Sequence, residues 1–193
     1  MRRSKSIRKT KETEIDVRLD LDGSCDINID TGIPFFDHML RSFATHGIFD
    51  LTVKASGDLE VDDHHTIEDV GICLGEALDK SLGDRKKIQR FGSARIPMDE
   101  SVAICAIDIG GRGYLVFDAE YTSEKVGGMS TQLVEHFLHA LVHKAGINLN
   151  IKVEGKNDHH MIEAIFKALG VSIDEATRID ERRKSVPSTK GSL

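Results

Sequence analysis

Hydrophobic and polar residues alternate in several short segments of the chain, which is the pattern of half-buried strands. In the N-terminal half this alternation predicts strands over residues 15–21, 27–29 and 49–55. Pro34 can begin a helix that Gly47 ends. From Asp63 apolar residues recur every three or four positions, which predicts a second helix that ends at Gly83.

The C-terminal half repeats this order of elements. We expect strands near 91–97, 101–109 and 113–119, then a helix, a strand and a long helix from Asn157 to about Asp180. No linker rich in Pro or Ser divides the halves, and the repeat is too long for a solenoid. The sequence therefore predicts one α+β domain over residues 1–193, built from internally duplicated half-domains at about 8–90 and 91–182.

Two motifs recur at matched places in the halves. His64-His65-Thr66-Ile67-Glu68 returns 95 residues later as His159-His160-Met161-Ile162-Glu163, and Asp37-His38-Met39-Leu40 returns 98 residues later as Glu135-His136-Phe137-Leu138. Residues three and four apart share a helical face, so one turn presents two imidazoles and a carboxylate. Adjacent side chains diverge by about 100° on a helix. Each signature therefore suits two different metal ions, or one ion and another partner.

The alternative for a single signature is a polar helix start with an Asp or Asn cap, which is a poor explanation of two matched copies. If the halves are related by pseudo-symmetry, the signatures can face one another and hold a pair of metals. Imidazole and carboxylate ligands suit Mn, Fe, Co or Zn, whereas the lack of thiolate ligands weakens a structural zinc site. His136, His139 and His143 share a helical face, and the repeat selects His136 because it aligns with His38. His46, His139 and His143 are then surface residues, or they contact the metal ligands without binding the metal.

Composition narrows the class of protein. Apolar residues make up 39% of the chain, and no apolar run approaches the about 20 residues of a membrane helix. The net charge of −6 argues against non-specific nucleic-acid binding. Six Lys or Arg lie within residues 1–11, and no apolar segment follows them as a secretory signal requires. We expect this run to be a solvated arm, with a nucleic-acid-binding arm as the rarer alternative. Three widely spaced cysteines favour reduced thiols and a cytoplasmic location.

Several of these motifs, in order, closely resemble imidazoleglycerol-phosphate dehydratases. They are Phe36-Asp37-His38-Met39-Leu40, the segment from Asp62 to Asp69, Gln132-Leu133-Val134-Glu135-His136-Phe137 and Asp158-His159-His160. The resemblance runs from about Arg8 to Gly191. It implies a fold of two four-stranded sheets with helices packed between them. It also implies a homo-oligomeric shell of 24 subunits with active sites at subunit contacts. Because the sequence contains no phosphatase half, we expect the monofunctional form.

The resemblance implies dehydration of imidazole glycerol phosphate to imidazole acetol phosphate in histidine biosynthesis. It implies two Mn²⁺ per active site, although the ligand types also admit Zn, Fe or Co. The implied ligands are His38, His64, His65, Glu68, His136, His159, His160 and Glu163. Two Lewis acids can hold both nitrogens of the substrate imidazole and favour its imidazolate form. We expect His64, Glu68, His159 and Glu163 to act in catalysis as well.

The proton shuttle implied by the resemblance is Glu12, in the segment Arg8-Lys9-Thr10-Lys11-Glu12-Thr13. Taken alone, Glu12 is a charged residue before a strand, for which a solvated position is the ordinary explanation. The implied phosphate contacts are Arg90, Arg112, Ser188, Thr189 and Lys190, the last three in a substrate-contacting tail over 183–193. Without the resemblance they indicate surface arginines and a frayed terminus.

The chain departs from the common family pattern at Ile67, Ser42 and Gly113. These departures bear on fine substrate contacts and leave the expected metal ligands in place. Two other functions fit the motifs less well. One is a di-metal hydrolase with a bridging hydroxide, and the other is a non-catalytic shell protein in which metal holds the subunits together.

Overall fold

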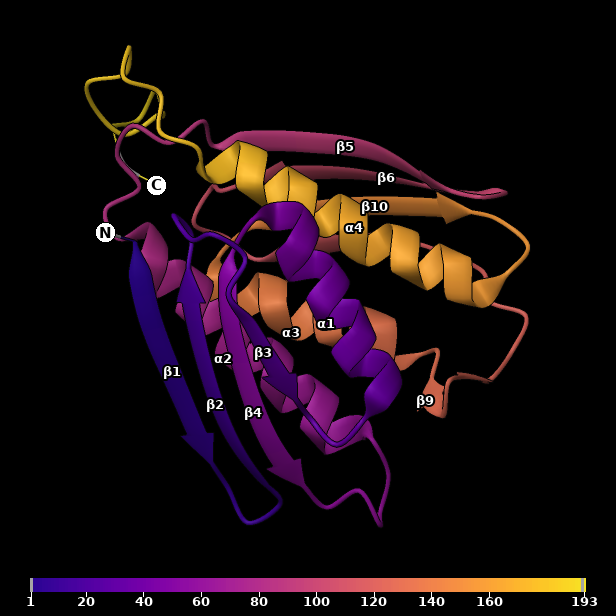
Figure 1. Ribbon diagram of the computed structural model, residues 1–193. Coiled ribbons are helices and arrows are strands. Elements are labelled where there is room, and N and C mark those ends of the chain that lie inside the picture. The colour runs from indigo at the N-terminus through magenta and orange to yellow at the C-terminus, as the bar shows by residue number, and fades with distance from the viewer. Residues whose placement is uncertain (1, 192) are drawn as a thin grey trace.

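The computed structural model describes residues 2–191 and 193, and it consists of two four-stranded sheets with four helices packed between them (Figure 1). The first sheet has the order β1-β2-β4-β3, with β1 Arg3–Lys9, β2 Thr13–Asp20, β3 Ile27–Asp30 and β4 Asp50–Gly57. The second has the order β5-β6-β10-β7, with β5 Phe91–Met98, β6 Ser101–Asp108, β7 Tyr114–Asp118 and β10 Asn148–Glu154. In each sheet only the last pair of strands is parallel. The α+β fold with duplicated halves is confirmed.

The four helices are α1 Pro34–Gly47, α2 His64–Leu82, α3 Leu133–Ala145 and α4 Asp158–Thr177. Pro34 begins α1 as expected, but the left-handed residue that ends it is Ile48 rather than Gly47. Gly47 is required for a different reason, because a Cβ there would lie 2.2 Å from the ring of Phe49. The amide side chain of Asn157 accepts hydrogen bonds from the first turn of α4 and fixes where that helix begins.

Glycines let the helices approach closely in both halves. A Cβ on Gly75 of α2 would lie 2.5 Å from the carbonyl oxygen of Leu141 in α3. A Cβ on Gly170 of α4 would lie 2.3 Å from the carbonyl oxygen of Phe43 in α1. Gly75 and Gly170 are 95 positions apart, the same interval as the histidine signatures. The duplication therefore includes the helix crossings α2–α3 and α1–α4.

One hydrophobic core joins the halves. Phe36 of α1, Phe137 of α3 and Phe166 of α4 are fully or almost fully buried, with ring centroids 5.3 to 6.5 Å apart. Inward-facing residues of both sheets, such as Val17 and Ile151, have no exposed surface. Burial of aromatic side chains from three helices in a single cluster stabilises one unit rather than two independent ones.

The basic N-terminal run is not a solvated arm, so that expectation is wrong for the described residues; Met1 lies outside them. Residues 3–9 form β1, paired antiparallel with β2 in continuous register from Arg3–Asp20 to Lys9–Glu14. Lys5 forms an ion pair with Asp16 at 3.0 Å and Lys9 one with Glu14 at 2.7 Å. Opposite charges across the two strands stabilise their pairing. Hydrophobic periodicity cannot predict a strand that is held by ion pairs between exposed side chains.

The connection between β7 and α3 contains a short hairpin that the sequence did not predict, β8 Lys125–Val126 and β9 Met129–Ser130. Two acidic residues at the starts of α2 and α4 hold this connection. Asp63 accepts a hydrogen bond from the Ser130 amide at 2.9 Å, and Asp158 accepts one from the Ser123 amide at 2.7 Å. Within the described residues, no helix is long and apolar enough to cross a membrane.

Candidate metal centre

The structure brings the predicted ligands together in two groups. The first group is His64 and Glu68 on α2 with His136 on α3. Nε2 of His64 lies 3.7 Å from Oε2 of Glu68, and the rings of His64 and His136 have centroids 4.8 Å apart. All three side chains are partly or fully exposed. The close crossing of α2 and α3 at Gly75 places a residue of α3 beside the first turn of α2.

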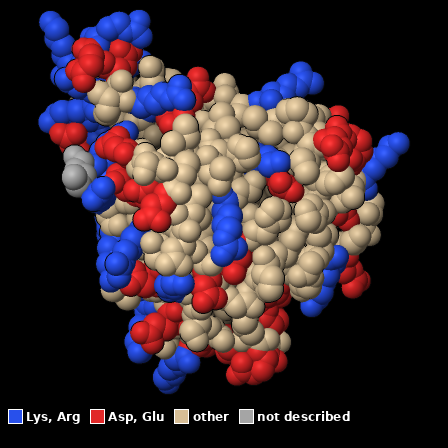
Figure 2. All heavy atoms as spheres, in the orientation of Figure 1, with Lys and Arg blue, Asp and Glu red and all other residues tan. Residues whose placement is uncertain are grey.

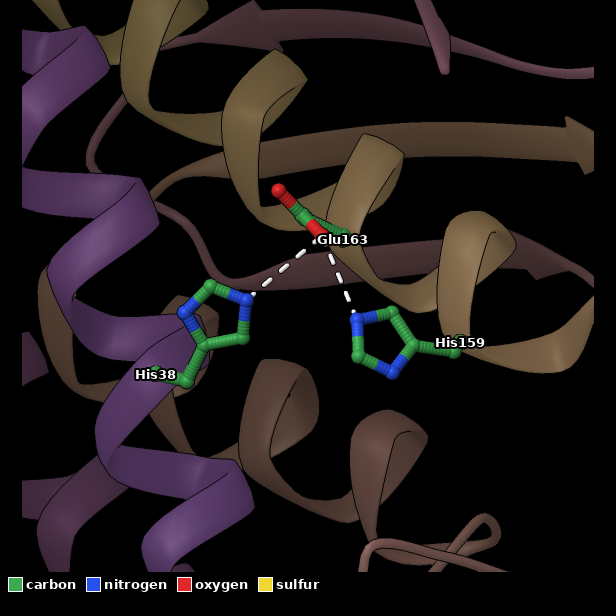
Figure 3. Close-up of side chains that lie close together, drawn as sticks. All are labelled: His38, His159 and Glu163. Atoms are coloured by element: carbon green, nitrogen blue, oxygen red, sulfur yellow. Dashed lines mark ion pairs between the residues drawn. The ribbon is translucent and has the colours of Figure 1, made fainter. Parts of the chain in front are cut away.

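The second group is His159 and Glu163 on α4 with His38 on α1, and their donor atoms all lie within 4.8 Å of one another. Figure 3 shows both imidazoles facing the same carboxylate. Oε2 of Glu163 is 3.5 Å from Nε2 of His38 and 3.4 Å from Nε2 of His159. Each group offers two imidazole nitrogens and one carboxylate oxygen, a donor set suited to a first-row divalent cation.

The remaining histidine of each signature turns away from its group. Nδ1 of His65 lies 3.1 Å from the carboxylate of Asp58, and Nδ1 of His160 lies 2.8 Å from that of Glu100. The rings of neighbouring His64 and His65 have centroids 6.2 Å apart and lie nearly perpendicular. His65 and His160 therefore do not contribute to the group of their own helix turn, as the 100° divergence of adjacent residues requires.

Carboxylates orient these two outer histidines and raise their pKa. The hydrogen bond to Asp58 raises the pKa of His65, and the hydrogen bond to Glu100 raises the pKa of His160. The bond to His160 in turn holds the pKa of Glu100 well below its usual range. A carboxylate on Nδ1 is a common arrangement behind a metal-binding imidazole, and Nε2 of His160 lies 3.7 Å from the exposed carboxylate of Asp99. Sequence reasoning missed Glu100, which lies 60 residues before His160, and Asp58, which lies seven residues before His65 in a loop with several acidic residues.

Glu12 lies in the turn between β1 and β2, beside His65 at the start of α2. Its Oε2 is 3.9 Å from Nδ1 of His65, and its side chain is 56% exposed. The structure thus places the expected proton-transfer residue next to one signature and next to solvent.

Lys167 is a neighbour of the second group that sequence reasoning missed. Its Nζ lies 2.8 Å from Oε1 of Glu163, and both side chains are largely buried. Burial alone raises the pKa of Glu163, but the hydrogen bond and charge of Lys167, with the imidazoles of His38 and His159, lower it overall. The Glu–Lys spacing of four residues is the signal that could have found it. The matching position after Glu68 is Ile72, so the two groups are not equivalent.

The predicted phosphate contacts lie at the opposite end of α4. The Arg90 amide donates to the carbonyl of Ala176 at 2.8 Å, near the C-terminus of that helix. Thirteen residues separate Ala176 from Glu163, or about 20 Å at the helical rise. Arg90 donates to both carboxylate oxygens of Asp108, at 2.6 and 3.0 Å, and to the carbonyl of Pro187 at 2.8 Å. Its guanidinium is therefore already engaged, and Asp108 raises its pKa.

The other phosphate candidates lie near the same end. Arg112 is exposed in the turn before β7, and Ser188 is half-buried in the C-terminal segment. The Gly191 amide donates to the Ser188 carbonyl at 3.1 Å, while Thr189 and Lys190 are exposed; position 192 of the predicted tail lies outside the described residues. Charged side chains surround the C-terminal segment, whereas the surface over α1 and α4 is largely uncharged (Figure 2).

The three departures lie away from the ligand atoms or in packed positions. Ile67 is fully buried and belongs to the core, and Ser42 is 8% exposed on α1. A Cβ on Gly113 would lie 2.6 Å from Cα of His143, so the backbone of α3 leaves no room for a side chain there.

A model of the imidazoleglycerol-phosphate dehydratase family matches residues 31–173. The chain belongs to this family. It is similar to the imidazoleglycerol-phosphate dehydratase of Haloarcula marismortui, with 55% identity over 96% of this chain and 95% of the relative. The enzyme of the same name from Acetivibrio thermocellus is 56% identical over 96% of each chain.

Solved structures agree with this dehydratase fold. The imidazoleglycerol-phosphate dehydratase of Staphylococcus aureus N315 has a TM-score of 0.84 and 37% identity, covering 92% of this chain and 99% of that one. The Pyrococcus furiosus enzyme in complex with (S)-C348 has a TM-score of 0.84 and 36% identity, covering 97% and 100%. The family and fold predicted from the motifs are confirmed. This dehydratase is therefore an enzyme of histidine biosynthesis, a hydro-lyase that breaks a carbon–oxygen bond.

Proposed function

We propose that this dehydratase converts imidazole glycerol phosphate to imidazole acetol phosphate at a centre of two divalent metal ions. The observation that supports it best is the pair of matched groups, each with two imidazoles and one carboxylate. The donors of the second group already converge within 4.8 Å, with Glu163 only 11% exposed, before any ion is considered. A carboxylate held against two imidazoles in this way fits a bound cation.

His64, Glu68 and His136 would hold one ion, and His38, His159 and Glu163 the other. We favour Mn²⁺, and the same donors accept Zn²⁺, Fe²⁺ or Co²⁺. When bound, the ions supply Lewis acidity toward the two nitrogens of the substrate imidazole. The carboxylates of Glu68 and Glu163 compensate cationic charge, and the hydrogen bond from Lys167 fixes which oxygen of Glu163 faces the imidazoles.

The active site in this proposal needs more than one copy of the chain. His65 and His160 point away from their own groups, and Arg90 lies about 20 Å from Glu163 along α4. We infer that neighbouring copies in a homo-oligomer, 24 subunits by family resemblance, bring these residues together. His65 and His160 would then complete the ligand sets of neighbours, and Arg112, Ser188, Thr189 and Lys190 would contact the substrate phosphate. The uncharged surface over α1 and α4 supports contact between copies (Figure 2).

Within the same proposal, Glu12 moves the proton. Dehydration must remove a proton from carbon and deliver one to the departing hydroxyl group, and a single carboxylate near both can do each in turn. The position of Glu12, 3.9 Å from His65 and still open to solvent, supports this role. The free thiols of Cys25, Cys73 and Cys105 support a reducing, cytoplasmic location.

The direct test is turnover of imidazole glycerol phosphate by metal-stripped protein with and without added Mn²⁺. We expect Mn²⁺-dependent formation of the keto product. Absence of product from folded protein that has regained two metals per chain would reject the proposed reaction. Because the chain belongs to a dehydratase family, the di-metal hydrolase and the non-catalytic shell protein are less well supported.

A further inference from the structure

One buried carboxylate holds both ends of the turn that carries Glu12. Asp69 follows Glu68 on α2 and is 7% exposed. Its Oδ1 accepts a hydrogen bond from Nε of Arg8 at 2.7 Å, and its Oδ2 accepts one from the hydroxyl of Thr13. Arg8 lies in β1 before the turn, and Thr13 begins β2 after it. Both acceptors of Asp69 are thus used to close the β1–β2 hairpin onto α2.

Further hydrogen bonds fix the backbone between those two anchors. The Thr10 hydroxyl accepts from the amides of Glu12 at 3.1 Å and Thr13 at 2.9 Å. The Glu12 carbonyl accepts from the amide of Asp58 at 3.1 Å, and the carboxylate of Asp58 binds His65. Glu12 therefore has a backbone fixed on both sides, although its side chain is exposed.

We propose that Asp69 is a positioning residue that sets Glu12 relative to His65; this rests on the proton-transfer role of Glu12 in the proposed function. Asp69 acts through its neighbours and touches no reacting atom. Because Asp69 shares α2 with His64 and Glu68, it fixes the proton-transfer group to the same rigid element that carries the metal ligands. Misplacing a catalytic group by about 1 Å can cost about 100-fold in rate.

The test uses Asp69→Asn in the full chain loaded with Mn²⁺, with Asp20→Asn as its matched control. Asp20 is 5% exposed, also accepts from an arginine of β1, and lies at the other end of the same hairpin. We expect kcat to fall at least about 10-fold in Asp69→Asn, with KM and two metals per chain retained. Asp20→Asn should keep kcat within about 2-fold, because it leaves the turn unchanged.

Amide hydrogen exchange of residues 10–13 provides a readout that does not depend on catalysis. Exchange should become faster in Asp69→Asn and not in Asp20→Asn. Unchanged exchange would overturn the positioning role, and so would faster exchange with normal kcat. If Asp69→Asn does not fold, Thr13→Val removes one of the two anchors, and the same two outcomes apply.

Glu12→Gln, measured in parallel, separates failure of the two proposals. Normal turnover in Glu12→Gln would overturn the proton-transfer role, and with it the catalytic purpose of Asp69. The exchange result would still show whether Asp69 fixes the turn. Loss of turnover in both Glu12→Gln and Asp69→Asn, with faster exchange in the latter, is the result that supports the proposal.

A separate observation concerns α3, which presents His139 and His143 one turn apart on its exposed surface. Their ring centroids are 4.3 Å apart. Among residues 2–191 and 193, neither ring makes a hydrogen bond or ion pair with another residue. Both follow His136, a member of the first metal group, along the same helix.

The geometry points to an accessory site for late first-row divalent cations, such as Ni²⁺, Cu²⁺ or Zn²⁺, formed by His139 and His143. Two histidines four residues apart on a helix present their nitrogens to one ion, as in helical zinc motifs. The pair offers two imidazole nitrogens and no carboxylate, a set that favours these cations over Mn²⁺. It is therefore distinct in its ligands from the two groups described above.

The probe is Ni²⁺, titrated calorimetrically at pH 7.5 into the Mn²⁺-loaded full chain while released Mn²⁺ is measured. We expect one Ni²⁺ per chain to bind in addition to any Ni²⁺ that replaces released Mn²⁺. His139→Asn and His143→Asn should each lose this binding, whereas His46→Asn, which changes an exposed histidine of α1, should retain it. Full Ni²⁺ binding in His139→Asn, or equal loss in His46→Asn, would overturn the site.

Discussion

Lys167 donates a hydrogen bond to Oε1 of Glu163 at 2.8 Å, while Oε2 of the same carboxylate faces two imidazoles. The charge of Lys167 partly neutralises the Glu163 carboxylate, and its hydrogen bond holds that carboxylate in place beside the two imidazoles. Among the described residues, Glu68 of the first group forms an ion pair with His64 and with no lysine or arginine, and Ile72 occupies the position that matches Lys167. The two halves are alike in fold and unlike in the charge around their carboxylates.

Removal of Lys167 should therefore destabilise the metal-free chain more than the metal-loaded chain. In Lys167→Met a largely buried Glu163 loses its hydrogen-bonded cation, which costs about 1–3 kcal/mol in the free energy of unfolding. A bound cation compensates part of that charge. Thermal unfolding at one fixed protein concentration, with and without Mn²⁺, measures the difference. Lys80→Met is the control, because Lys80 is 53% exposed and its ion pair with Glu76 is long, at 3.8 Å. An equal effect of both changes on the free energy of unfolding would contradict the prediction.

Loss of one ligand from the second group should remove one metal per chain. We expect His38→Asn to retain about one of two Mn²⁺ and to lose turnover by about 100-fold or more, because a catalytic metal keeps three or more protein ligands in most sites. Metal analysis after dialysis gives the stoichiometry. His46→Asn lies two turns further along the same helix and should retain both ions. Full metal content in His38→Asn would exclude His38 as a ligand.

Hydrophobic periodicity predicts the strands whose inward residues are fully buried, such as β2 with Ile15 and Val17. It does not predict β1, where Ser6 is buried and Ile7 is 60% exposed, because that strand is held by charge pairs and by Asp69. The β8–β9 hairpin is too short to show a period at all. Elements whose stability comes from cross-strand charge or from loop contacts are therefore the ones that sequence patterns miss.

For the site, repeat matching predicts which histidines lie together, because the duplication includes the glycines that set the helix crossings. Pattern reasoning does not reveal Asp58, Glu100 or Lys167. Glu100 lies 60 residues before His160 and reaches it only in the folded chain, whereas Asp58, seven residues before His65, is one of several acidic residues in its loop. The distance from Arg90 to Glu163 is also invisible in sequence, where the resemblance assigns both residues to one active site. It follows from the length of α4.

The His160–Glu100 pair gives the metal-free protein a pH-dependent stability. The pKa of Glu100 is depressed from 4.5, so its contribution is present above pH 4.5 and is lost as the pH falls through the lower folded value. The pKa of His160 is raised from 6.5, so its contribution is complete below pH 6.5 and is lost as the pH rises through the higher folded value. The pair therefore stabilises most between pH 4.5 and 6.5.

Glu100→Gln should thus lower the melting temperature of metal-free protein most in that window and less at pH 8. It should also lower the pKa of His160, followed by NMR titration of its ring protons. His46 provides the internal reference in the same spectrum, since it lies on another helix away from Glu100. A melting-temperature loss that is constant from pH 5 to pH 8 would show that Glu100 acts through packing rather than through charge.

Substitution of the glycines at the helix crossings tests whether close packing of the helices is needed for metal binding. Ala in place of Gly inside a helix ordinarily stabilises a protein by about 1 kcal/mol. At Gly75 and Gly170 the added Cβ would lie 2.5 and 2.3 Å from a carbonyl oxygen of the crossing helix, so those helices must separate. We therefore expect Gly75→Ala and Gly170→Ala to reverse the usual sign and destabilise by about 1–3 kcal/mol. Because α2–α3 carries the first group and α1–α4 the second, each change should weaken Mn²⁺ binding by its own group while sparing the other. Calorimetric titration of both variants distinguishes this from a general loss of stability, which would weaken both groups together.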